Sequence, residues 1–294
     1  MPEEHALSMP EIAIAAISLS VFLSSFILWI GWGIKRVRSG RSIGSEWIQP
    51  WQIGWINFGI FFCGLICLTF AVQVFLAFII KLVGAEEIST VWLMAIGALS
   101  IQSAFLIGYA CCRKYFPEIF RGNLHGRSLN SLRAFYSAFL FFLRSLPIIF
   151  IVAFTWNAIL GKLVEMGLID SFPPQEAVLA FSSGESPIAL GVIAFAAILL
   201  APLAEEIIFR GCIYRFFKSR VSTHQAMWIS AFTFGLIHGN LMALVPLTVV
   251  GFLLAYSYER EGNLLIPIFF HGIFNCFTLT MTSLYSISGQ PLPY

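Results

Sequence analysis

Hydrophobic residues occupy long runs of this sequence, and short polar segments separate the runs. Several runs approach 20 residues, which is the length that a helix needs to cross a bilayer. We therefore predict an all-α fold, a polytopic transmembrane helical bundle of about eight spans. The spans begin near Ile12, Ile53, Val91, Ser145, Pro187, Thr223, Leu241 and Asn263.

The aromatic-rich segment Ser131–Phe150 allows two interpretations. It is either an amphipathic helix in the membrane interface, with the fourth span starting near Ser145, or the start of that span with Arg144 reaching back to the headgroups. We favour the interfacial helix. After the seventh span we predict a turn over Tyr258–Gly262.

Composition excludes an ordinary soluble domain. Of the 294 residues, 59% are hydrophobic and 11% are charged, and the mean hydropathy is +0.86. The formal net charge of +2 is too small to indicate a nucleic-acid surface. The six cysteines form no CxxC pair, so neither a disulfide framework nor a zinc knuckle is expected. We expect the first apolar run to be a retained helix, because no basic segment precedes it.

Basic residues are distributed unevenly between the loops. Four lie in 35–41, five or six in 113–144, four in 210–220, and one is Arg260, whereas the alternate loops hold only Lys81 and Lys162. Cytoplasmic loops carry an excess of Lys and Arg. We therefore expect both termini outside and these four loops in the cytoplasm.

The sequence APLAEEIIFRG at 201–211 places Glu205, Glu206 and Arg210 within an apolar stretch. Ionisable residues inside a membrane are costly and indicate a functional site. Arg210 lies one helical turn after Glu206, so we expect this pair to neutralise one carboxylate and orient the other. An ordinary ion pair at the headgroups is the alternative.

Helix spacing brings other polar residues to the same depth. If the fifth helix turns back near residue 222, Glu205 and His238 both lie about 15 residues from the turn, or roughly 22 Å along their helices. His271 and Asn275 are four residues apart and share a helix face. Their distances from the next cytoplasmic turn are roughly 13 and 20 Å. We thus expect Glu205, His238, His271 and Asn275 to converge in one depth band.

This set of side chains suits hydrolysis. Glu205 would take a proton from a water that His238 orients, and His271 with Asn275 would stabilise an oxyanion. Each motif alone has a structural explanation. His238 could be a satisfied buried histidine, and His271 with Asn275 could hydrogen-bond neighbouring helices. Pro202, just before Glu205, should free a backbone carbonyl.

Together, Glu205-Glu206-xxx-Arg210, Phe234-xxx-His238 and His271-xxx-Asn275 resemble the CAAX-processing and bacteriocin-processing (CPBP or Abi) family of intramembrane glutamic endopeptidases. The resemblance covers residues 188–284. It implies a protease core there, preceded by an N-terminal transmembrane region at 1–187 and followed by a tail at 285–294. It also implies a glutamate-dependent endopeptidase, a hydrolase of a bacterial cytoplasmic membrane whose site opens toward the cytoplasm.

Several functions stay open at this stage. The substrate would be a lipidated, CAAX-like protein or a membrane-inserted peptide, with membrane lipids as the other partners and no nucleic acid. No cofactor is expected, although Glu205, His238 and His271 could form the ligand set of a zinc-dependent membrane protease. A non-proteolytic scaffold or bacteriocin-immunity protein, or a transporter with a proton relay, are further alternatives.

Overall fold

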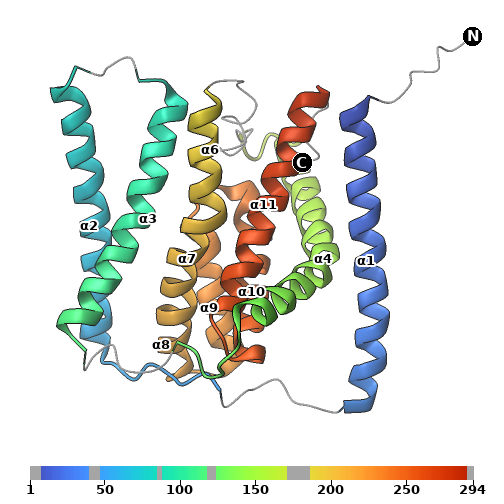
Figure 1. Ribbon diagram of the computed structural model, residues 1–294, viewed down its shortest axis with the longest axis horizontal. Coiled ribbons are helices and arrows are strands. Elements are labelled where there is room, and N and C mark those ends of the chain that lie inside the picture. The colour runs from blue at the N-terminus through green and yellow to red at the C-terminus, as the bar shows by residue number, and fades with distance from the viewer. Residues whose placement is uncertain (1–7, 40–46, 85–87, 118–123, 171–185, 290–294) are drawn as a thin grey trace, which may run out of the picture.

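The computed structural model describes residues 8–39, 47–84, 88–117, 124–170 and 186–289 (Figure 1). The described residues form helices and no strand, which confirms the predicted helical bundle. Predicted features at residues 1–7, 40–46, 85–87, 118–123, 171–185 and 290–294 lie outside this part of the chain. The helices are α1 Met9–Ser39, α2 Trp55–Leu82, α3 Thr90–Tyr115, α4 Ser131–Glu165, α6 Pro187–Phe195, α7 Ala201–Glu206, α8 Arg215–Lys218, α9 Thr223–Leu236, α10 Leu241–Glu261 and α11 Leu265–Ser288.

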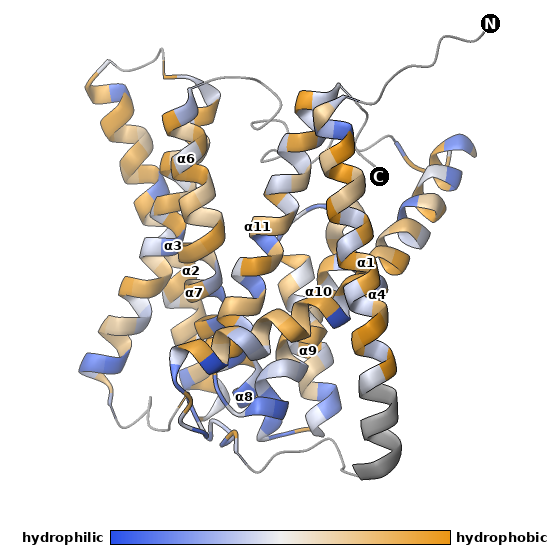
Figure 2. Ribbon diagram, turned by 45° about the vertical axis from the view of Figure 1, so that its right-hand side comes forward, coloured by the Kyte–Doolittle hydropathy of each residue, from blue (hydrophilic) through white to orange (hydrophobic). Residues whose placement is uncertain are grey.

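Among the described residues, seven helical segments are long and apolar enough to cross a membrane. Apolar residues make up most of these helices (Figure 2). Within the α2 span only 6% of the apolar window is buried in the protein, as expected of a helix that faces lipid. The sixth predicted span corresponds to α9, which has 14 residues. At 1.5 Å per residue this helix is about 21 Å long, short of the roughly 30 Å of a hydrocarbon core.

The described chain begins and ends at the same end of the bundle (Figure 1). Helices α1, α3, α8 and α10 end at the opposite end of the bundle, so the described parts of the basic segments that follow them share one side, as predicted. Ser222 starts α9 with a reciprocal capping box to Gln225, which is why the chain turns back close to the predicted position. Helix α10 continues to Glu261, so the turn predicted over Tyr258–Gly262 begins only at Gly262.

Helix α4 is one helix of 35 residues with Pro147 inside it. Its N-terminal half lies across the bundle, and its C-terminal half bends toward the end at which the described chain begins (Figure 1). Proline removes a backbone donor and clashes with the preceding turn, so a bend near Pro147 is expected. The location of the N-terminal half in a membrane interface remains a prediction.

The column from Pro187 to Lys218 is continuous but contains two π-helical stretches. Residues Ala196–Leu200 (η1) and Ile207–Tyr214 (η2) are π-helical, and the short α7 lies between them. Such wide turns are uncommon and often accompany functional sites. Here they flank the segment that carries both glutamates.

Candidate active site

Backbone carbonyls near Pro202 create the first part of the site. Proline has no N–H, and in a π-helix the N–H of residue 202 would have bonded the carbonyl of residue 197. The Asn275 Nδ2 donates to that carbonyl, the Ala197 O, at 2.7 Å. This hydrogen bond links α11 to the π-helical turn. It uses the backbone carbonyl that Pro202 was predicted to leave free.

Close approach of α11 to the same turn depends on Gly272. A Cβ added at Gly272 would lie 2.7 Å from the carbonyl oxygen of Ile198. Any larger residue would therefore push α11 away from η1. This contact sets the position of His271, the preceding residue, relative to α7.

Glu206 and Arg210 form a fully buried ion pair. Arg210 Nη1 lies 2.8 Å from Glu206 Oε1, and both side chains are 0% exposed. Arg210 Nη2 also donates to the Gly251 carbonyl at 2.8 Å, and its guanidinium lies 4.8 Å from the ring centroid of Phe234. The predicted pairing is confirmed. A headgroup ion pair is the wrong description, because water does not reach either group.

His271 joins this pair to the second glutamate. Its Nδ1 lies 2.9 Å from Glu206 Oε1, and its Nε2 lies 3.9 Å from Glu205 Oε2. A carboxylate can only accept hydrogen bonds, so Nδ1 carries a proton when Glu206 is ionised. The imidazole therefore stands between two carboxylates and presents Nε2 toward Glu205.

Gln102 of α3 supplies a contact that the sequence analysis missed. Its Nε2 donates to Glu205 Oε1 at 3.0 Å, and Glu205 is only 8% exposed. Within the described part of the chain, the buried Oε1 of Gln102 has no hydrogen-bond partner. The available signal was a lone glutamine in the apolar run 91–112, but spacing alone could not assign it to Glu205.

His238 is not inside a membrane helix, which corrects the sequence prediction. Helix α9 ends at Leu236, and His238 lies in the turn before α10. Its side chain is exposed, and its ring lies 4.9 Å from that of Phe234, centroid to centroid. The ring of Phe234 is also 5.6 Å from that of His271. The ring of Phe234 thus contacts both histidines, the exposed His238 and the buried His271.

The two histidines have different hydrogen-bonding partners. Nδ1 of His238 lies 2.7 Å from the Phe234 carbonyl oxygen. A carbonyl can only accept, so this contact requires a proton on Nδ1 and leaves Nε2 of a neutral ring as an acceptor. Nε2 of His238 can thus accept a hydrogen bond from a water molecule.

Metal ligation has no geometric support among these side chains. In the described ranges, no three His, Cys, Asp or Glu residues converge closely enough to hold a metal ion. Glu205, His238 and His271 therefore do not form the tetrahedral set that zinc requires. The expectation that the protein needs no cofactor stays a prediction.

Comparison with known proteins identifies the region that contains the site. Residues 187–277 match the family described as type II CAAX prenyl endopeptidase Rce1-like. This match confirms the resemblance drawn from the three motifs, since it includes Glu205, His238, His271 and Asn275. Gln102 lies outside it.

Curated relatives also match this chain over a short stretch of its length. The Bacillus subtilis protein named "Putative membrane peptidase YdiL" is 35% identical over 83 residues, which is 28% of this chain and 34% of that protein. The Lactococcus lactis UPF0177 protein YxdF is 29% identical over 97 residues, which is 33% of this chain and 53% of that protein. This chain therefore covers about a third to a half of the length of these relatives. No solved structure matches significantly.

Proposed function

We propose that this protein, whose residues 187–277 match the Rce1-like family, is an intramembrane endopeptidase that uses Glu205 as its general base. One observation carries the proposal. Of two adjacent buried carboxylates, Glu206 is neutralised by Arg210, whereas Glu205 receives only the neutral amide of Gln102 and faces His271. A carboxylate without a cationic hydrogen-bond partner is the better proton acceptor.

The first step would be attack of water on the peptide carbonyl. Glu205 takes one proton of the water, and Nε2 of His238 accepts a hydrogen bond from the other O–H. The water oxygen then bonds to the carbonyl carbon, and the carbonyl oxygen becomes an oxyanion. When the C–N bond breaks, Glu205 returns the proton to the leaving amine.

The oxyanion would be stabilised from α11. Asn275 uses one amide hydrogen for the Ala197 carbonyl, which leaves the second available. His271 directs Nε2 toward Glu205 and the reacting carbonyl, because its Nδ1 contacts Glu206 Oε1 at 2.9 Å. The Glu206–Arg210 pair therefore acts on the reaction indirectly, by orienting His271.

Gln102 would be a positioning residue for the base. Its Nε2 can only donate, so the contact with Glu205 fixes both the carboxylate rotamer and the orientation of the amide. The amide Oε1 of Gln102 then points away from Glu205. It can accept a hydrogen bond from water or from a substrate N–H. This contact also ties α3, outside the family match, to the reaction.

The substrate would be a peptide presented from the membrane, lipidated or membrane-inserted. Glu205 lies within a helix that is apolar enough to span the bilayer. An apolar substrate could therefore reach it from the lipid. A CAAX-like terminus is the form suggested by the family match.

The decisive experiment compares peptide termini in membranes that contain wild-type protein or Glu205→Gln at equal abundance. Glutamine keeps the size and the hydrogen bond acceptor but is not a base, so termini that appear with wild type should vanish. Glu165→Gln is the matched control, because this side chain is 70% exposed at the far end of α4. Termini that are identical in wild type and Glu205→Gln would refute proteolysis and favour the scaffold or immunity alternative.

A further inference from the structure

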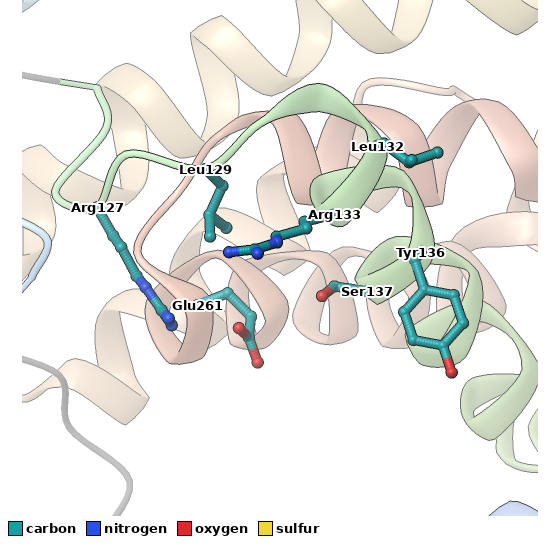
Figure 3. A pocket seen from close by; sticks show the side chains of 7 residues that line it. All are labelled: Arg127, Leu129, Leu132, Arg133, Tyr136, Ser137 and Glu261. Atoms are coloured by element: carbon teal, nitrogen blue, oxygen red, sulfur yellow. The ribbon is translucent and has the colours of Figure 1, made fainter.

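A groove separate from the glutamates lies at the loop end of the bundle, beside the start of α4 (Figure 3). Its volume is about 540 Å³, within the range of about 300–1,000 Å³ that is usual for small-molecule sites. The side chains that line it come from the segment before α4, the first turns of α4 and the end of α10. They are Arg127, Leu129, Leu132, Arg133, Tyr136, Ser137 and Glu261.

The groove carries an excess of positive charge. Arg127 and Arg133 both extend toward it (Figure 3), and no side-chain partner for either guanidinium occurs among the described residues. Glu261 is the one acidic residue of the lining. Arg144 interacts electrostatically with Arg260 and Glu261, so more positive charge adjoins the groove.

One neighbouring arginine is also incompletely satisfied. Arg144 is half-buried on α4, and its Nε is buried without a hydrogen-bond partner in the described part of the chain. Leaving a buried charged donor unpaired is costly. A bound anion would reduce the repulsion among the like charges at this end of the bundle.

The backbone holds the groove in a fixed shape. The Arg127 N–H donates to the Gly262 carbonyl at 2.9 Å, and Asn263 Nδ2 donates to the Arg127 carbonyl at 2.9 Å. Asn130 caps α4 by accepting from the Arg133 N–H. Gly262 has φ +70°, and a Cβ there would lie 3.4 Å from the Arg127 Cβ. The two arginines therefore start from backbone that is tied to the α10–α11 turn.

Exposed apolar side chains continue from the groove along α4. Leu132 is 76% exposed, Tyr136 62%, Phe135 47% and Phe139 41%. Large exposed apolar side chains need an apolar neighbour, and in a membrane protein the acyl chains of lipids supply one. The guanidinium groups of arginine can form two parallel hydrogen bonds to phosphate oxygens. Next to such an apolar surface, they suit a phosphodiester attached to acyl chains.

We propose that this groove binds the phosphate headgroup of an anionic phospholipid, whose acyl chains lie against the exposed face of α4. The arginines contact the phosphate oxygens, and Tyr136 and Ser137 offer hydroxyl groups to the rest of the headgroup. The lipid thereby fixes the half of α4 that lies across the bundle. This proposal is independent of the proteolytic one, since it uses none of the residues around Glu205.

The test is a titration of the purified full-length protein with phosphatidylglycerol, with phosphatidylcholine as the neutral lipid, followed by native mass spectrometry of bound lipid. A basic side chain near an anionic lipid contributes about 1 kcal/mol, or about fivefold in affinity. Arg127→Gln/Arg133→Gln should therefore weaken phosphatidylglycerol binding by about 25-fold. Phosphatidylcholine carries a choline cation beside its phosphate, so its binding should be weaker and should change less.

Two further variants separate a built site from bulk charge or misfolding. Lys81→Gln/Lys162→Gln removes the same number of charges from the opposite end of the bundle and should leave phosphatidylglycerol affinity unchanged. Glu261→Gln removes the repelling carboxylate and should tighten binding by about fivefold, a gain that a misfolded protein cannot produce.

The proposal fails if both double variants lose affinity equally, or if Glu261→Gln does not tighten binding. It also fails if inorganic phosphate displaces phosphatidylglycerol at equal concentration, because the groove would then bind a soluble anion rather than a lipid. Lipid binding that is lost selectively in Arg127→Gln/Arg133→Gln, with proteolysis present or absent, supports it.

Discussion

The buried pair Glu206–Arg210 makes a quantitative prediction about stability. The two groups lie 2.8 Å apart and are both 0% exposed. Replacing Glu206 by Leu leaves the Arg210 guanidinium in the interior with the Gly251 carbonyl as an acceptor. Replacing Arg210 by Met leaves the Glu206 carboxylate with His271 alone.

Breaking such a pair costs about 3–5 kcal/mol, because one charge remains buried without its partner. We expect each single variant to lose stability by this amount. The double variant Glu206→Leu/Arg210→Met buries no unpaired charge, and apolar replacement of a buried pair is often close to neutral. Its remaining cost is the buried Nδ1 of His271, which loses its Glu206 acceptor, about 1–3 kcal/mol for an unsatisfied buried group. The double variant should therefore be no less stable than either single variant.

The assay is equilibrium unfolding of the purified protein in mixed micelles with increasing SDS, followed by tryptophan fluorescence. A double-mutant cycle gives the coupling energy directly. Lys162→Gln is the control, since its pair with Glu165 is 69% and 70% exposed and should contribute less than about 1 kcal/mol. Single variants within about 1 kcal/mol of wild type, or additive losses in the double variant, would refute the buried-pair argument.

Three further predictions concern the packing around Glu205. Gln102→Leu removes a hydrogen bond to a charged group, worth about 1.5–3 kcal/mol, so cleavage should fall about 10- to 100-fold at unchanged abundance, whereas Gln73→Leu on α2 should have no such effect. Gln102→Glu should cleave poorly at neutral pH and recover as the pH falls, because a protonated carboxyl at position 102 can again donate to Glu205; a flat pH response would contradict this role. Gly272→Ala forces a Cβ to 2.7 Å from the Ile198 carbonyl oxygen and should cost about 1–3 kcal/mol in thermal unfolding, whereas Gly191→Ala, with open space around it, should not destabilise the protein.

Local sequence determined most of the architecture. Long apolar runs predict membrane helices because every backbone group in lipid must be paired within its own segment. Helix starts at Thr223 and Leu241 follow from local capping signals, namely Ser222 with Gln225 and Asn240 with the Ala243 N–H. The pair Glu206–Arg210 follows from its four-residue spacing alone.

Only the tertiary structure decided which groups meet. The π-helical turns around Pro202 are a property of the packed column, so the link from Asn275 to the Ala197 carbonyl could not be read from spacing. Gln102 reaches Glu205 across 103 positions of sequence, and the end of α9 before His238 depends on how α9 packs against α10. Helix periodicity specifies which residues share a face, but the partner of that face is set by packing between helices. The sequence therefore determined the spans and the candidate residues, and the structure determined that Glu206 is neutralised while Glu205 is held by a neutral amide.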